Sequence, residues 1–155
     1  MVRIEALTPE LVQKYRNEIA KFYYDNLQEY SCLEHYTYDE AYEKIADFIY
    51  HLANSSAIGY GAFDSDGICG YIWVYPHQFR EEKRMYVNEI RVKEEYRNRG
   101  IGSQLMKLAE ERAKELGLGA IYLHAEAENK KVRKLYEAFG YVEERIQMRK
   151  EIIKE

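Results

Sequence analysis

The chain has 155 residues, of which 46% are hydrophobic, so it is long enough to bury the core of one compact domain over residues 1–155. The net charge of −4, with both signs interleaved, argues against nucleic acid as the main partner, because phosphate neutralisation needs a basic surface. No segment approaches the roughly 20 apolar residues that span a bilayer, and residues 1–10 lack the pattern of a secretory signal. We therefore expect no membrane partner and a cytoplasmic protein.

The first elements are a strand and a helix. Apolar and charged residues alternate over residues 2–6, which predicts a short strand. Thr8 followed by Pro9 is typical of an N-cap and the first position of a helix, and the apolar stripe of this helix continues to Phe22. Residues 25–36 have no period and are predicted to form a loop.

A second helix and a hairpin follow. Thr37 and Glu40 form a capping box, with apolar residues at helical spacing behind it. Residues 57–63 and 68–75 are rich in β-branched and aromatic side chains, and an Asp-Ser-Asp-Gly turn separates them. We expect a hairpin that closes at Pro76.

The second half alternates strands and helices. The pattern predicts strands over residues 85–92, 120–125 and 141–150, and helices over residues 105–116 and 130–139. The expected order is βααβββαβαβ, which indicates a mixed α/β fold with a central β-sheet flanked by helices.

The segment before the helix at residues 105–116 is a candidate anion site. A strand that leads through a glycine-bearing turn into a helix gathers unpaired backbone N–H groups at the positive end of the helix dipole. Gly100 and Gly102 permit close approach of the backbone, and Arg97 and Arg99 can add charge-assisted contacts. A structural turn explains two glycines more simply, so the loop alone leaves both readings open.

In its setting the loop resembles the acetyl-CoA motif of the GNAT superfamily of N-acetyltransferases, Arg/Gln-x-x-Gly-x-Gly/Ala after a bulged strand. Arg97, Gly100 and Gly102 match this motif. Farther along the chain, Asn129 and Tyr136 are similar to the second signature of the family. The resemblance implies the GNAT fold and identifies the chain as an acetyl-CoA-dependent N-acetyltransferase.

Within the second signature, Val132 and Tyr141 replace the alanine and phenylalanine that the family usually has. Both replacements are mild. The clear likeness covers residues 85–150, whereas the first half is similar only in the order of its elements.

The resemblance also implies roles at the donor site. The backbone N–H of Ile90 would stabilise the oxyanion, the main chain of Val92 would bind the pantetheine arm, and Tyr136 would protonate the leaving thiolate. By helical spacing alone Tyr136 is a packing residue, so its acid role rests on the resemblance. Asn129 is predicted to cap its helix and to contact the acetyl-bearing end of the donor. The other donor-binding residues implied are Arg91, Arg97, Asn98, Arg99, Gly100, Ile101, Gly102 and Ser103.

A general base is needed because an alkyl amine is neutral in roughly one molecule in a few thousand at pH 7, which costs about 4 to 5 kcal/mol. Glu89 stands beside the expected oxyanion donor and is the candidate, although a glutamate in a strand of mixed polarity usually faces solvent. Tyr86 lies where some family members carry a glutamate base. His77 and His124 are expected to be structural or exposed.

The acceptor is expected to be a primary amine of a small molecule or peptide. The loop between the first two helices would line its site with Tyr30, His35, Tyr36 and Tyr38 beside acidic residues, which suits an organic cation. No metal is expected, and a homodimer is possible by analogy with the family. Two alternatives are a non-catalytic domain that binds acetyl-CoA and an unrelated nucleotide-binding domain.

Overall fold

The computed structural model describes residues 1–28 and 36–153, and within these residues the chain divides into two compact units, Met1–Leu123 and His124–Glu155. The helices of the first unit are α1 (Pro9–Lys14), α2 (Arg16–Gln28), α3 (Tyr38–Ala53) and α4 (Ile101–Glu115). Its strands are β1 (Arg3–Ala6), β2 (Ile58–Asp64), β3 (Gly67–Phe79), β4 (Glu82–Val92) and β5 (Ile121–Tyr122). A single turn of 3₁₀ helix, η2, spans Glu94–Tyr96. The second unit contains α5 (Lys130–Ala138).

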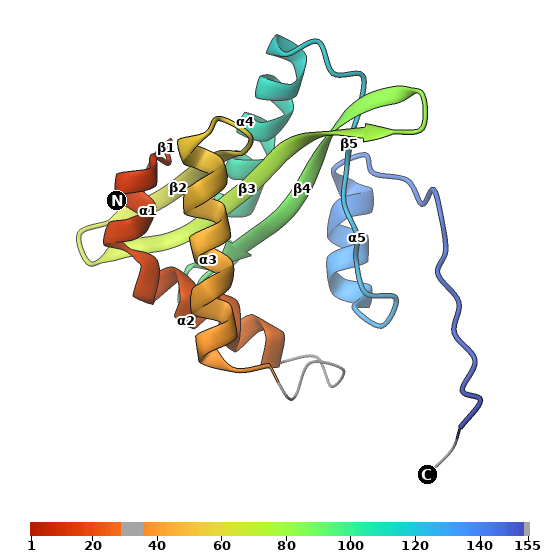
Figure 1. The fold of residues 1–155 in the computed structure, drawn as a ribbon, viewed down its shortest axis with the longest axis horizontal. Coiled ribbons are helices and arrows are strands. Elements are labelled where there is room, and N and C mark those ends of the chain that lie inside the picture. Colours follow the sequence, from red (N-terminus) through yellow and green to blue (C-terminus); the bar gives the residue numbers. More distant parts are fainter. Residues whose placement is uncertain (29–35, 154–155) are drawn as a thin grey trace. The chain divides into compact units, whose positions relative to one another are not determined.

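The five strands form one mixed sheet in the order β1-β2-β3-β4-β5. The first four are antiparallel to their neighbours, and β5 pairs with β4 in parallel. Helices α1 to α3 cover one face of the sheet and α4 covers the other (Figure 1). The expected fold class, a mixed sheet flanked by helices, is confirmed.

The core beneath α1 to α3 is aromatic. Phe48 of α3 stacks on Trp73 of β3 with ring centroids 4.5 Å apart, and Phe22 of α2 meets the fully buried Tyr71 edge-on at 5.3 Å. Aromatic pairs of this kind stabilise a fold beyond the apolar area that they bury. The same layer also receives Glu89, the candidate base, as described below.

The predicted helix starts are confirmed. The Thr8 hydroxyl accepts a hydrogen bond from the backbone N–H of Leu11 at 3.1 Å, and the Thr37 hydroxyl accepts one from Glu40 at the same distance. Pro9 occupies the first turn of α1, where its missing N–H breaks no helical bond. Short side-chain signals therefore located both starts correctly.

Two expectations in the first half were wrong. The single helix expected after Pro9 is divided at Tyr15, which leaves helical geometry with φ −102° and ψ 16°. Beyond this break α2 continues to Gln28, so residues 25–28, which were expected to lie in a loop, are helical. A helix that is already nucleated extends at low cost through polar residues that have no apolar period.

The hairpin also does not close at Pro76. Strand β3 runs through this proline to Phe79, and Pro76 lies opposite Met85 of β4. Strand β2 pairs with β3 only as far as Val74, so the missing N–H of the proline breaks no bond to β2.

The strand expected over residues 141–150 is absent, and the observed order of helices and strands is βαααβββαβα. Val142 and Met148 are 85% and 89% exposed, and in the described part of the chain this segment pairs with no strand. Alternation of apolar and polar residues predicts which face of a strand is apolar. The strand itself forms only where a neighbouring strand satisfies its backbone hydrogen bonds. Among the described residues no helix has both the length and the apolar character needed to cross a membrane.

Candidate functional site

A β-bulge in β4 determines which way Glu89 faces. Val87 lies opposite Val74 of β3, whereas Glu89 lies opposite Trp73, so Asn88 is an extra residue without a partner in the register. Adjacent residues of a strand point to opposite faces. The bulge therefore places Glu89 on the Trp73 face, under α1 to α3, and leaves Val87 on the other face.

Glu89 is only 9% exposed, so the competing interpretation of this residue as solvent-facing does not hold. Its Oε2 lies 2.7 Å from Nη2 of Arg91, and the Arg91 guanidinium lies over the Tyr23 ring, 5.3 Å from its centroid. Burial raises the pKa of Glu89 above its ordinary value of 4.5, while Arg91 and Lys44 act to lower it. The result is a buried carboxyl group that holds a proton more readily than an exposed glutamate does.

The glycine loop has the backbone geometry of an anion site. Asn98 and Gly100 both adopt positive φ, 64° and 80°, and α4 begins at the next residue, Ile101. Gly100 is the N-cap and has no side chain to accept bonds from the first-turn N–H groups, and this turn contains no acidic residue. No described atom lies within 4 Å of a Cβ built on Gly100, so the approach to these groups is open. Ile101 is buried and Ser103 is exposed.

The arginines near this loop have different environments. Nε of Arg97 donates to the carbonyl oxygen of Val92 at 3.1 Å, which ties the loop to the end of β4. The Arg99 guanidinium lies over the Tyr96 ring, 5.1 Å from its centroid, and Arg99 is exposed. The Arg91 side chain, in contrast, pairs with the Glu89 carboxylate beneath α1 to α3.

The open edge of β4 contains the expected donor-binding backbone. In the residues that the structure describes, β5 pairs with β4 only at Met85 and Tyr86. Ile90 and Val92 lie beyond this pairing, and their side chains are half-buried. An extended group could add to this edge as a further strand would.

The second unit holds the remaining expected donor residues. Oδ1 of Asn129 accepts from the backbone N–H of Val132 at 3.2 Å, so the predicted cap of α5 is confirmed. Tyr136 is half-buried and meets Tyr141 edge-on, with ring centroids 5.7 Å apart. The cap and the ring pair both lie within this unit.

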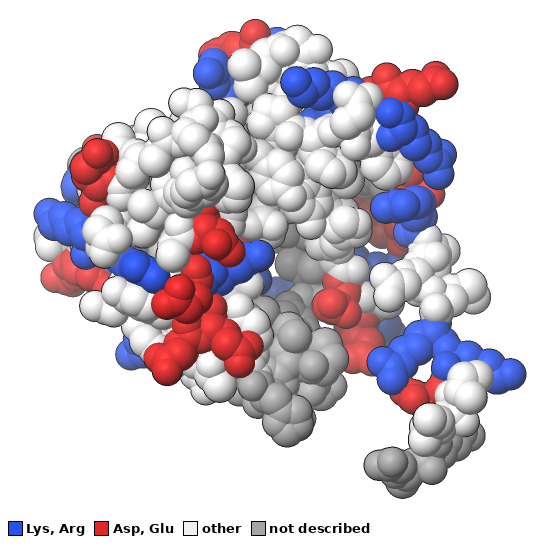
Figure 2. Space-filling model, viewed as in Figure 1, with Lys and Arg blue, Asp and Glu red and all other residues white. Residues whose placement is uncertain are grey.

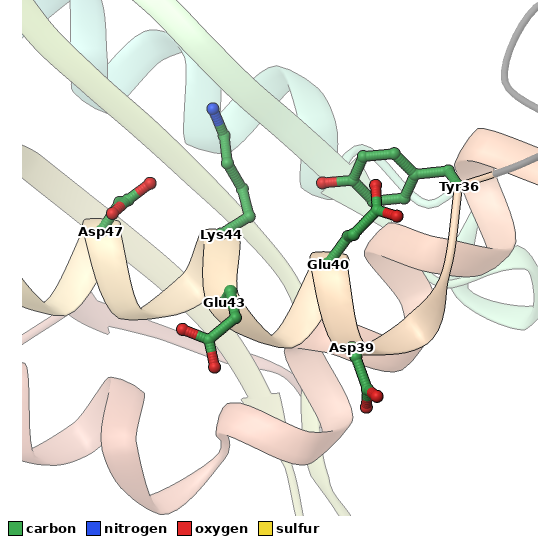
Figure 3. Close-up of a pocket in the computed structure, with 6 residues that line it drawn as sticks. All are labelled: Tyr36, Asp39, Glu40, Glu43, Lys44 and Asp47. Carbon is green, nitrogen blue, oxygen red and sulfur yellow. The ribbon is translucent and has the colours of Figure 1, made fainter.

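An acidic hollow of about 410 Å³ lies along α3. Figure 3 shows Tyr36, Glu40 and Lys44 on one side of the helix axis in this view, and Figure 2 shows acidic side chains gathered on the same part of the surface. The residues that line the hollow are Tyr36, Asp39, Glu40, Glu43, Lys44 and Asp47.

Of the two expected acceptor-site residues that the structure describes, Tyr36 lines this hollow and Tyr38 does not. The Tyr38 hydroxyl donates instead to Oδ1 of Asn17 at 3.2 Å. Tyr30 and His35 lie outside the described residues.

An aromatic cluster occupies the far ends of β3, β4 and β5. The Tyr86 ring lies 5.3 Å from that of Tyr75 and 5.0 Å from that of Tyr122. His77 is exposed and its Nδ1 lies 2.5 Å from the Tyr122 hydroxyl, so this histidine has a partner that the sequence did not reveal. His124 is exposed, as expected.

Comparison with known proteins identifies the family. The sequence model of the acetyltransferase (GNAT) family matches residues 15–141. The chain belongs to the GNAT family. It is 30% identical over 83 residues to an uncharacterised N-acetyltransferase of Bacillus subtilis (strain 168), YdgE, which covers 54% of this chain and 53% of the relative. It is 32% identical over 97 residues to probable N-acetyltransferase 14 of Xenopus tropicalis, which covers 61% and 45%. The chain spans about half the length of the curated relatives it matches.

Solved structures share the GNAT fold over nearly the whole chain. A putative acetyl transferase from Pyrococcus furiosus is 25% identical with a TM-score of 0.72, covering 97% of this chain and 100% of that one. A predicted acetyltransferase from Clostridium acetobutylicum, solved with acetyl-CoA, is 16% identical with a TM-score of 0.77, covering 98% and 97%. At the latter identity the likeness shows the fold alone.

The sequence did not single out two residues of this GNAT chain that contact or face Glu89. From the sequence, Tyr23 is interpreted as a packing residue on the apolar stripe of α2, and Lys44 as a solvent-exposed residue of α3. Lys44 lines the hollow, and its ammonium acts to lower the pKa of Glu89. A charge at the hollow therefore influences the buried carboxyl group. Tyr23 and Lys44 lie on helices that are distant in sequence from β4, and no short sequence pattern predicts which helix residues lie near Glu89.

Proposed function

We propose that the chain transfers the acetyl group of acetyl-CoA directly to a primary amine, without a covalent enzyme intermediate. The observation that carries the proposal is the uncapped start of α4 after the Asn98 and Gly100 turn, in a chain of the GNAT family. Unpaired N–H groups at a helix start, together with the helix dipole, suit the pyrophosphate of coenzyme A. Ser103 and the backbone of residues 98–102 would surround this group.

The reacting end of the donor would lie along the open edge of β4. There the N–H of Ile90 would stabilise the oxyanion that forms when the amine attacks the thioester. The main chain of Val92 would bind the pantetheine arm, although its carbonyl already accepts from Arg97. Binding of the arm at Val92 would therefore use the N–H group or rearrange the Arg97 contact.

Tyr136 would protonate the leaving thiolate, and Asn129 would contact the acetyl-bearing end besides capping α5. In the variant Tyr136→Phe we expect turnover to fall about 100-fold or more, within the usual effect of a general acid, while the Kd for acetyl-CoA changes little. Steady-state kinetics and calorimetry separate the two effects. Turnover equal to that of the native chain would remove Tyr136 from the mechanism.

The acceptor would be a cationic amine that binds in the hollow along α3. Four carboxylates and one ammonium line this hollow, and Tyr36 adds an aromatic ring. An organic cation gains from both the carboxylates and the ring. Glu89, a buried carboxylate with a raised pKa, would take the proton that the ammonium must lose before attack.

Two measurements test this function. Calorimetry with acetyl-CoA, ATP and NAD separately should give binding of acetyl-CoA alone, whereas binding of ATP or NAD in its place would indicate an unrelated nucleotide-binding protein. Spermidine, sisomicin, free amino acids and peptides with a free amino terminus are then screened with a free-thiol readout. Acetylation of hydroxyl acceptors only would overturn the proposal, and binding without transfer to any acceptor would favour the non-catalytic alternative.

A further inference from the structure

Among the described residues that line the acidic hollow, Lys44 of α3 is the basic one. Glu40 and Asp47 lie one helical turn before and after it, so all three share one side of the helix. In Figure 3 the Lys44 side chain extends from α3 on the same side as Tyr36 and Glu40. Within the part of the chain that the structure describes, Lys44 nevertheless forms no ion pair with a carboxylate. The hollow that suits an amine therefore already contains one.

The Lys44 ammonium lies over the aromatic layer of the core. Its Nζ is 5.7 Å from the centroid of the Trp73 ring, within the range of a cation–π contact. Trp73 is buried, and its ring is held in place by stacking on Phe48 of the same helix. The stem of Lys44 thus leads its amine from the helix surface toward strand β3.

The position of Trp73 brings this amine near the proposed reaction centre. In the pairing of β3 with β4, Trp73 lies opposite Glu89, and opposed residues share one face of a sheet. Burial raises the pKa of Glu89, and the Lys44 ammonium is one of the charges that act to lower it. Ile90, whose N–H is the proposed oxyanion donor, is the next residue of β4. The amine therefore lies over a strand position that neighbours both groups.

We propose that Lys44 is itself an acceptor, so that the chain acetylates its own Lys44 when acetyl-CoA is bound. This inference rests on the proposed acetyl transfer and gives that site an intramolecular substrate. The flexible four-carbon stem of a lysine allows Nζ to move from the Trp73 ring toward a thioester held at Ile90. Acetylation removes the positive charge of Lys44 and leaves the carboxylates of the hollow, which strengthens the attraction for a cationic acceptor.

The transfer exchanges a C–S bond for a C–N bond. An N–H bond of the Lys44 ammonium breaks, and its proton passes to the Glu89 carboxylate directly or through a water. The neutral Nζ attacks the thioester carbon, the C–N bond forms and the C–S bond breaks. The thiolate takes a proton from Tyr136, as in transfer to any other amine, and the new amide nitrogen releases its second proton. Acetyl-CoA and the ammonium thus give acetyl-lysine, coenzyme A and one proton.

The first test uses the native chain and acetyl-CoA alone, and peptide mass spectrometry follows the acetylation of each lysine with time. Lys14 is the internal reference, because its ammonium also lies over an aromatic ring, 5.2 Å from the centroid of Tyr15, but does not line the hollow. Lys44 should be acetylated at least about 100-fold faster than Lys14, since it is held beside the donor. Dilution of the chain should not change the fraction acetylated per unit time, because the reaction is intramolecular.

Lys44→Arg and Lys14→Arg form a matched pair for the second test. Arginine keeps the positive charge, but its guanidinium stays protonated and is not an amine nucleophile. Without an external acceptor, the native chain and Lys14→Arg should release a burst of free thiol equal to the amount of chain. Lys44→Arg should release none beyond slow hydrolysis. Calorimetry checks that each variant binds acetyl-CoA, and the spectra of the native chain decide the question if Lys44→Arg does not.

The remaining outcomes separate this inference from the proposed function. If Lys44 is acetylated no faster than Lys14, self-acetylation is wrong, and the proposed function still stands when spermidine or sisomicin is acetylated. A rate per chain that rises with the concentration of the chain would show transfer between two copies and would overturn the intramolecular reaction. If the native chain does not bind acetyl-CoA, the proposed function and self-acetylation fail together.

Discussion

Gly100 and Gly117 stand at opposite ends of α4 in the same backbone conformation. Their φ angles are 80° and 72°, and no described atom lies within 4 Å of a Cβ built on either residue. Alanine at each position should therefore meet only the backbone strain of the left-handed region, about 1–2 kcal/mol. The two sites differ in function, because only Gly100 belongs to the proposed donor loop.

Gly100→Ala and Gly117→Ala are thus a matched pair. Both should lower the free energy of unfolding by a similar amount in urea denaturation. Only Gly100→Ala should weaken acetyl-CoA binding by about tenfold or more in calorimetry, since its strain is relieved by moving the N–H groups that hold the pyrophosphate. Equal affinities in the two variants would argue against this loop as the donor site.

The raised pKa of Glu89 predicts a pH-dependent stability. A carboxyl whose pKa is higher in the folded than in the unfolded chain stabilises the fold below the unfolded value, near 4.5, and loses this contribution as pH rises through the folded value. Relative to Glu89→Gln, which does not titrate, the native chain should lose stability from pH 4.5 upward. Urea denaturation of both proteins from pH 4 to 8 measures the difference. A trend of opposite sign would mean that the Arg91 ion pair outweighs burial.

For single residues, the sequence predicted the roles that depend only on neighbours in the chain. These are the helix cap formed by Asn129 and the glycine turn at residue 100. The direction of Glu89 did not follow, because alternation along β4 assumes an unbroken register and the bulge at Asn88 is set by pairing with β3. The position of Tyr23 against Arg91 required a contact between α2 and β4 that no short sequence pattern encodes.

At the scale of elements, the side-chain cap of α5 has two possible roles that can be separated. Asn129→Ala removes the oxygen that accepts from Val132 and should cost about 1 kcal/mol of unfolding free energy. Asn129→Ser keeps a capping oxygen and should restore most of this stability. If Asn129 also contacts the donor, the serine variant should still show a raised KM for acetyl-CoA. A native KM in the serine variant would limit Asn129 to capping.

The elements themselves were predictable where a local signal sets them. Capping residues located the starts of α1, α3 and α5, and apolar spacing located α4, which ends just before Gly117 as expected. Prediction failed where pairing decides, as at residues 141–150 and at the extension of β3 past Pro76. Backbone hydrogen bonds between strands depend on which partner is present, and this information is distributed over the whole chain.

For the whole molecule, unfolding can test the prediction that residues 1–155 are one domain. Trp73 is the single tryptophan, is buried in the first unit and stacks on Phe48, so its fluorescence reports that unit alone. Far-UV circular dichroism reports both units, including α5. One domain should give coincident transitions by the two probes, and acetyl-CoA should raise both midpoints equally. Separate transitions would show that the units unfold independently.

The extra residue at Asn88 has a consequence for how this protein could have evolved. Val87 and Glu89 face opposite sides of the sheet, as adjacent residues of a regular strand do, so deletion of the Asn88 codon would remove the bulge and leave Glu89 opposite Trp73, beneath α1–α3. An insertion at this point of a strand can therefore be absorbed as a bulge, so related chains could differ by one residue here while the buried acid keeps its facing.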